Sequence, residues 1–106
     1  MNHITPAFKW RDRTGEFHEI SKMETRHLYY TLRMIWNHTM PEEVKLTPYN
    51  AYDFSSFYTA EYMAEAIHHI GTELLKRTDI LPGWQKDLSF MASVVLKQNP
   101  LLKSYT

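Results

Sequence analysis

A predicted β-hairpin over residues 7–20 constrains the fold more than any other feature of the sequence. Its centre is Asp12-Arg13-Thr14-Gly15, where aspartate at the first turn position and glycine at the fourth suit a type I turn closed by a glycine bulge. This turn sets a register in which Trp10 faces His18 on a mostly apolar side of the hairpin. Because two strands alone are marginally stable in water, we expect the hairpin to pack on helices or on a strand of another chain. The opposite, solvent-facing side carries Lys9 opposite Glu19 and Arg11 opposite Phe17.

A helix is predicted over residues 21–38, directly after the hairpin. Ser21 and Glu24 have the spacing of a capping box, in which Ser21 is the N-cap and the Glu24 side chain reaches back to it. Apolar side chains recur around more than half of the circumference of this helix, which is wider than one core-facing stripe requires. The sequence therefore predicts a second contact surface on this helix, between the subunits of a homo-oligomer.

The rest of the chain predicts a connector at residues 39–57 and a helical hairpin at residues 59–98. Prolines interrupt the connector, and a short helix over 41–44 would shorten it. We therefore expect one domain spanning residues 1–106, of class α+β and helix-dominated, with an N-terminal two-stranded hairpin packed on three helices. The predicted core stripes of the helical hairpin are Met63, Ala66, Ile67, Ile70 and Leu74 in its first helix and Trp84, Leu88, Met91 and Val95 in its second.

Composition excludes several classes of protein. The chain has no cysteine, so disulfides, thiolate metal sites and cysteine nucleophiles are ruled out. Its formal net charge is zero, whereas a general duplex-DNA binder carries a basic excess, so duplex DNA is not an expected partner. No run approaches the roughly 18–20 apolar residues that span a membrane, and the first residues lack the pattern of a signal peptide. The sequence therefore predicts a cytoplasmic protein with no membrane partner.

Four residues of the predicted helix suggest a ligand site. Arg26, Tyr29, Arg33 and Trp36 follow one another at three- and four-residue steps, which would place them along one strip of the helix. Rings stack on nucleobases and guanidinium groups bind phosphates, so the strip predicts a nucleotide-type ligand. The alternative is that the arginine stems cover rings at a dimer interface. The residues expected to complete the pocket are His68, His69, Tyr49 and Tyr52.

Two Glu-x-x-His steps, Glu24 with His27 and Glu65 with His68, have the spacing that di-iron bundles use. Such spacing directs a carboxylate and an imidazole from one helix face towards a shared ion. The alternative assigns Glu24 to the capping box and Glu65 to solvent, and it is preferred, so no metal ion or other cofactor is expected. His27 is interpreted as a core histidine that bonds a backbone carbonyl or links the helix to the hairpin, rather than as a catalytic residue. The residues predicted to have structural roles are Trp10, Gly15, Ser21, Glu24 and His27.

No pattern in the sequence predicts an enzyme. With three glycines in the whole chain, no dinucleotide or nucleoside-triphosphate loop can be written. No serine or paired carboxylates stand in a recognisable catalytic context. A binding protein is therefore expected.

Residues 8–35 resemble a recurring opening of small proteins encoded by tailed bacteriophages. In those proteins a tryptophan-containing hairpin with a glycine turn is followed by a helix that begins with the pattern Ile-x-x-Met-x-x-x-His-Leu. This chain resembles them in Trp10 and Gly15 of its hairpin and in the stretch from Ile20 to Leu28. The resemblance implies an accessory protein that acts inside the infected bacterial host. Some phage proteins of this size are oligomeric sponges that sequester the cyclic nucleotide signals of Thoeris and CBASS immunity, and this chain is similar to them in size and aromatic content.

The leading hypothesis is therefore a non-catalytic counter-defence protein that forms a homo-oligomer and sequesters a nucleotide-type signal between its subunits. A second hypothesis is a phage protein that inhibits a host defence or replication protein by direct contact. A third is a di-metal protein built on the two Glu-x-x-His steps.

Overall fold

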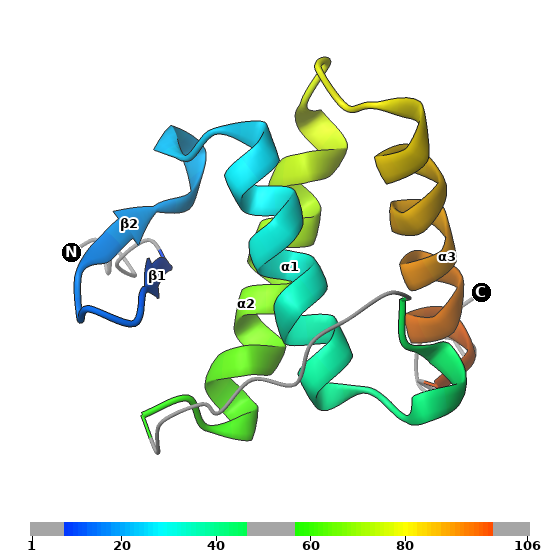
Figure 1. Cartoon of the computed structure of the whole chain (residues 1–106), viewed down its shortest axis with the longest axis horizontal. Helices are drawn as coiled ribbons and strands as arrows, with labels where there is room; N and C mark the ends of the chain where they lie inside the picture. Colours follow the sequence, from blue (N-terminus) through cyan, green and yellow to red (C-terminus); the bar gives the residue numbers. More distant parts are fainter. Residues whose placement is uncertain (1–7, 47–56, 99–106) are drawn as a thin grey trace, which may run out of the picture.

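The computed structural model describes residues 8–46 and 57–98, with the side chains of residues 8–46 and 57–95. A two-stranded antiparallel hairpin precedes three helices, which confirms the predicted helix-dominated α+β class (Figure 1). The hairpin lies on one side of the α1–α2 pair, and α3 lies on the other. The elements in chain order are β1 (Lys9–Arg11), β2 (Phe17–Glu19), the 3-10 helix η1 (Ile20–Lys22), α1 (Thr25–Thr39), the 3-10 helix η2 (Glu42–Val44), α2 (Ala60–Lys76) and α3 (Pro82–Gln98).

The hairpin has the predicted register. Lys9 pairs with Glu19, Trp10 with His18, and Arg11 with Phe17. Gly15 closes the turn with a φ of 92°, a backbone conformation that only glycine adopts readily, and its N–H donates to the Asp12 carbonyl over 3.0 Å. The turn chemistry read from the sequence therefore determines which side chains share each face of the hairpin.

The apolar side of the hairpin packs on α2 and the residues just before it. The Trp10 ring lies 5.4 Å from the Tyr58 ring and 5.8 Å from the Tyr62 ring, measured between centroids. Phe8 stacks on His69 at 4.8 Å. Trp10 is 3% exposed, so the hairpin contributes its largest ring to the core, as its predicted structural role requires.

The predicted capping box at the start of α1 is wrong. The helix begins at Thr25, with Glu24 as an N-cap residue whose side chain makes no capping bond, and Ser21 belongs to η1 instead. The physical reason is the burial of Met23, which is extended and 6% exposed and therefore separates η1 from α1. The Arg77 guanidinium, at the end of α2, donates to the backbone carbonyls of Met23, Ser21 and Ile20 and so ties the segment before α1 to α2.

Helix α1 lies at the centre of the described structure and uses its broad apolar surface within the chain. Leu28, Leu32 and Ile35 are at most 1% exposed in the core shared with α2. On another side of the helix, the Tyr29 ring stacks on Trp84 of α3 with centroids 4.9 Å apart. The breadth of the apolar surface is thus explained by two neighbouring helices, and it no longer supports the prediction of an oligomer.

The α2 stripe is buried as predicted except for Ile67, which is half-buried, and in the α3 stripe Trp84 is half-buried and Val95 is replaced by Val94. Val94 is 6% exposed and belongs to the core, whereas Val95 is 37% exposed and faces outward. The short helix expected at residues 41–44 is present as η2. The Asn37 amide fixes the chain after η2, because it donates to the Leu46 carbonyl over 3.0 Å and accepts from the Leu46 N–H over 2.6 Å. The predicted ligand residues Tyr49 and Tyr52 lie outside the described residues.

Candidate interaction site at the hairpin edge

The ligand strip predicted on α1 does not form a surface. Trp36 is fully buried, and its indole Nε1–H donates to the Val44 carbonyl over 2.9 Å. Tyr29 is 1% exposed. Steps of three and four residues do put side chains on one side of a helix, but here Trp84 of α3 stacks on Tyr29, and Trp36 is bonded to Val44 of η2. Both rings are therefore core residues and are not available to stack on a base.

The two arginines of the predicted strip have separate surroundings. Arg33 lies beside the buried hydroxyl of Tyr29, at 3.4 Å, and its Nη1 is 3.9 Å from the Asp87 carboxylate. The Tyr29 hydroxyl donates to Asp87, and burial, followed by this bond, raises the pKa of Tyr29 to about 12. Arg26 is exposed and its guanidinium lies 5.2 Å from the centroid of the Tyr30 ring. Tyr30, rather than Tyr29, is thus the solvent-facing ring of α1.

The histidines do not complete the predicted site either. His68 and His69 are exposed on α2, where His69 stacks on Phe8 of the hairpin and not against the α1 strip. His27 is exposed and its ring lies 5.9 Å from that of His18, so the predicted core histidine is wrong. The side of α1 that carries Thr25 and Leu28 faces the core, which leaves His27 outside.

The two Glu-x-x-His steps are not assembled into one site. Glu24 and His27 line a cleft beside the hairpin, whereas Glu65 and His68 are exposed on α2. Within residues 8–46 and 57–95, the group of carboxylates and imidazoles whose ligand atoms lie within 4.8 Å of one another is Asp12, Glu16 and His18. This group belongs to the hairpin turn, and the sequence pattern did not single it out.

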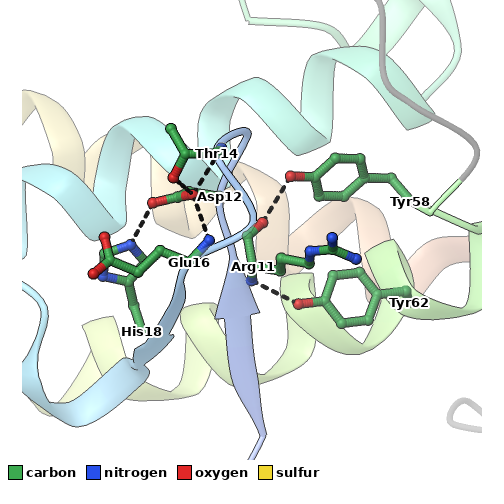
Figure 2. A network of polar contacts seen from close by, with 7 residues as sticks. All are labelled: Arg11, Asp12, Thr14, Glu16, His18, Tyr58 and Tyr62. Carbon is green, nitrogen blue, oxygen red and sulfur yellow. Dashed lines mark hydrogen bonds and ion pairs between the residues drawn. The ribbon is translucent and has the colours of Figure 1, made fainter.

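The outer backbone edge of β1 is capped by two tyrosine hydroxyls. The Tyr62 hydroxyl accepts from the Arg11 N–H over 2.8 Å and donates to the Lys9 carbonyl over 2.7 Å. The Tyr58 hydroxyl donates to the Arg11 carbonyl over 2.8 Å (Figure 2). Burial raises the pKa of both tyrosines, so the hydroxyls stay protonated. An edge that would otherwise accept another strand is therefore closed by α2 and the residue that precedes its cap.

No side chain of residues 8–46 or 57–95 caps the outer edge of β2 in this way. In an antiparallel pair, alternate residues point their backbone groups towards the partner strand and away from it. Lys9 and Arg11 point outward on β1, so their partners Glu19 and Phe17 point outward on β2. Among the described residues, no hydrogen bond reaches these outward N–H and C=O groups. We call the outward backbone groups of Phe17 and Glu19 the open edge of β2.

A cleft of about 640 Å³ borders the open edge, between β2 and the start of α1. It is shallow and open to solvent, and its lining mixes cationic, anionic and ring side chains. Lys22 and Glu19 form an ion pair over 2.9 Å within this lining, and Phe17 is 56% exposed. The lining residues are Lys9, Phe17, His18, Glu19, Lys22, Met23, Glu24 and His27.

Asp12 holds the hairpin end of the site. Its Oδ1 accepts from the Thr14 hydroxyl over 2.6 Å and from the N–H groups of Thr14 and Glu16 over 2.9 and 3.0 Å. Its Oδ2 lies 2.7 Å from His18 Nε2 (Figure 2). The hydrogen bonds from Thr14 and then from His18 hold the pKa of the Asp12 carboxyl far below its ordinary value of 3.8. The carboxylate therefore stays ionised and fixes the turn that orients β2.

The depressed pKa predicts a specific pH dependence of stability. A carboxyl whose pKa is lower in the folded state than in the unfolded state stabilises the fold above its ordinary value of 3.8, and this contribution is lost as the pH falls below that value. We expect the stability difference between wild type and Asp12→Asn to be largest at neutral pH and to shrink in acid. Thermal unfolding of both proteins from pH 7 down to pH 3 measures it. A constant difference across this range would contradict the role of the ionised carboxylate.

Sequence reasoning did not anticipate the contrast between the two edges. Tyr58 and Tyr62 lie four residues apart, a spacing that puts both on one helical face, but nothing local shows that this face meets β1. No helix in the described part of the chain is both long and apolar enough to cross a membrane. Comparison of the chain with protein families, with curated proteins and with solved structures finds no match.

Proposed function

We propose that this chain is a non-catalytic binding protein that captures an extended segment of a partner protein on the open edge of β2. The observation that carries the proposal is the contrast between the two edges of one small sheet. Tyr58 and Tyr62 cap the edge of β1, whereas no residue in the described part of the chain caps the edge of β2, which borders a cleft. Uncapped edges of this kind accept an additional strand, since each new backbone hydrogen bond replaces one to water.

The cleft suits a peptide better than a small anion. In strand addition, backbone bonds supply affinity and pockets for alternate side chains supply specificity. The charged lining residues are balanced, with Lys9 and Lys22 against Glu19 and Glu24, and the exposed Phe17 ring offers an apolar contact. A segment with both charged and apolar side chains would satisfy this lining, whereas a phosphate group would meet two carboxylates.

The resemblance to phage accessory proteins supplies the biological setting of the proposal. In that setting the partner is a bacterial host protein, and strand addition inhibits it by direct contact. This is the second of the functions that the sequence suggested. It takes precedence because Tyr29 and Trp36, the rings of the predicted nucleotide strip, are buried.

A nucleotide-type ligand remains the second candidate, relocated to the cleft. The observation in its favour is that the ammonium groups of Lys9 and Lys22 and the rings of Phe17 and His27 line the same concavity. Native mass spectrometry of protein purified from bacteria that carry active nucleotide-based defences tests it. A bound mass that Phe17→Ala removes supports the nucleotide, and a protein of the expected mass alone supports the peptide.

Substituting Glu19 separates strand addition from other modes of binding. Glu19 has a φ of −75°, which proline adopts, and its N–H points away from β1, so Glu19→Pro removes one outward donor without breaking a bond inside the hairpin. Glu19→Gln removes the same charge and keeps the N–H. We expect Glu19→Pro to weaken partner binding at least about tenfold. The variant lacks one hydrogen-bond donor, and its proline ring occupies space that the added strand would need. Glu19→Gln should stay close to wild type.

The measurement is affinity capture from host lysate, followed by titration of the captured protein with each purified variant. Amide hydrogen exchange of the complex adds a direct readout, because the Phe17 and Glu19 N–H groups should be protected while a partner strand occupies the edge. Equal binding by Glu19→Pro and Glu19→Gln, or no protection of these two amides, would overturn the proposal. Circular dichroism of the proline variant checks that the fold is retained.

A further inference from the structure

We infer that in the free protein the open edge of β2 is occupied by β2 of a second copy of the chain, in an antiparallel four-stranded sheet about a two-fold axis. Partner capture is then an exchange of strands, a consequence that rests on the proposed function. The dimer itself follows from the backbone geometry of β2 and from the residues that each register would bring together.

One register uses the whole open edge. When two β2 strands run antiparallel with His18 opposite His18 of the second copy, Phe17 of each chain pairs with Glu19 of the other. These are the residues whose backbone groups point outward, so each pair exchanges two N–H···O=C bonds and the dimer gains four. The two copies are related by a two-fold axis between the His18 residues, which is the commonest symmetry of soluble dimers.

Neighbouring registers lose half of these bonds. Shifting the axis to Phe17 would place Glu19 opposite Gly15, whose φ of 92° belongs to the turn and not to a strand. Shifting the axis to Glu19 would place Phe17 opposite Ser21, which lies in η1. In each shifted register a single pair of strand residues remains. The register centred on His18 is therefore the one that the local structure favours.

Side-chain pairing across this register is compatible with association. On the face that carries Lys9 and Glu19, each Glu19 would lie opposite a Phe17 ring, and its charge is already balanced by Lys22 at 2.9 Å. On the other face, the two His18 rings would meet between the two Trp10 rings. The chain has a formal net charge of zero with neutral histidines, so no overall repulsion opposes the dimer.

A single cysteine tests the register directly, because the chain contains none. Directly opposed residues of a non-hydrogen-bonded antiparallel pair have Cα atoms about 4.5 Å apart, within the range that a disulfide spans. We expect His18→Cys to form a covalent dimer under mild oxidation, read on a non-reducing gel. His68→Cys is the matched control, since His68 is an exposed histidine on α2, away from the proposed interface.

Size-exclusion chromatography with light scattering completes the test without relying on the folding of a cysteine variant. We expect wild type and Glu19→Gln to be dimers and Glu19→Pro to be a monomer. A monomeric wild type, or equal cross-linking of the two cysteine variants, overturns the dimer and leaves the proposed partner binding standing. A wild-type dimer whose Phe17 and Glu19 amides are protected supports the inferred dimer. If such a dimer forms but no host partner is captured, the proposed function fails and the dimer stands.

Discussion

Replacing Trp36 with alanine is expected to lower the free energy of unfolding by about 4 kcal/mol, since removing a buried tryptophan leaves a large cavity. The ring is 0% exposed and belongs to the hydrophobic core. The substitution also leaves the Val44 carbonyl without the indole donor that lies 2.9 Å away. Urea unfolding followed by circular dichroism measures the loss. Among the predicted variants, we expect this one to have the largest effect.

Tyr30→Ala is the matched control, because Tyr30 is a ring on the same helix that is 46% exposed. Its removal should cost less than about 1 kcal/mol, as for most surface substitutions. Trp36→Phe separates the two contributions, since phenylalanine fills most of the space but cannot donate to Val44. If Trp36→Ala keeps its stability and loses a bound ligand instead, then the ligand role first predicted for Trp36 is right and its burial is not what matters.

The hairpin could be predicted from the sequence because its determinants are local. Asp12 and Gly15 specify the turn, and the turn specifies the register, so Trp10 and His18 were paired correctly before any tertiary information. The same reasoning extends to the open edge. Once Lys9 is known to point outward, the orientation of Glu19 follows from the alternation of the ladder.

The features that could not be predicted all depend on contacts between distant segments. Ser21 and Glu24 have the spacing of a capping box. In the structure, however, Met23 between them is buried and extended, and its carbonyl accepts from Arg77, which lies more than fifty residues away in the chain. Helical spacing put Tyr29 on a strip with Arg26, and it could not show that Trp84 of α3 covers the ring. Sequence periodicity shows which residues share a helix face, but it does not show which other element packs against that face.

The Arg77 guanidinium joins the end of α2 to the segment between the hairpin and α1. Its Nη1 donates to the Met23 carbonyl over 2.9 Å and to the Thr25 hydroxyl over 3.0 Å, and its Nη2 reaches the carbonyls of Ile20 and Ser21 at 3.4 and 3.3 Å. Its Nε forms an ion pair with Glu73 over 2.9 Å. The side chain is 18% exposed, so water cannot replace most of these bonds when it is removed.

Arg77→Ala is therefore expected to destabilise the protein by about 3 kcal/mol, because hydrogen bonds from charged groups contribute more than neutral ones and their acceptors would be left unsatisfied. Arg77→Lys should recover only part of this loss, since an ammonium group cannot reach the spread of acceptors that the planar guanidinium serves. Lys76→Ala, at the exposed neighbouring position, should change stability by no more than about 0.5 kcal/mol. Urea unfolding of the three variants measures these differences. Because η1 directly follows β2, Arg77→Ala should also speed amide hydrogen exchange in the hairpin. If Arg77→Ala is as stable as wild type, then α1 and η1 hold their positions without the guanidinium.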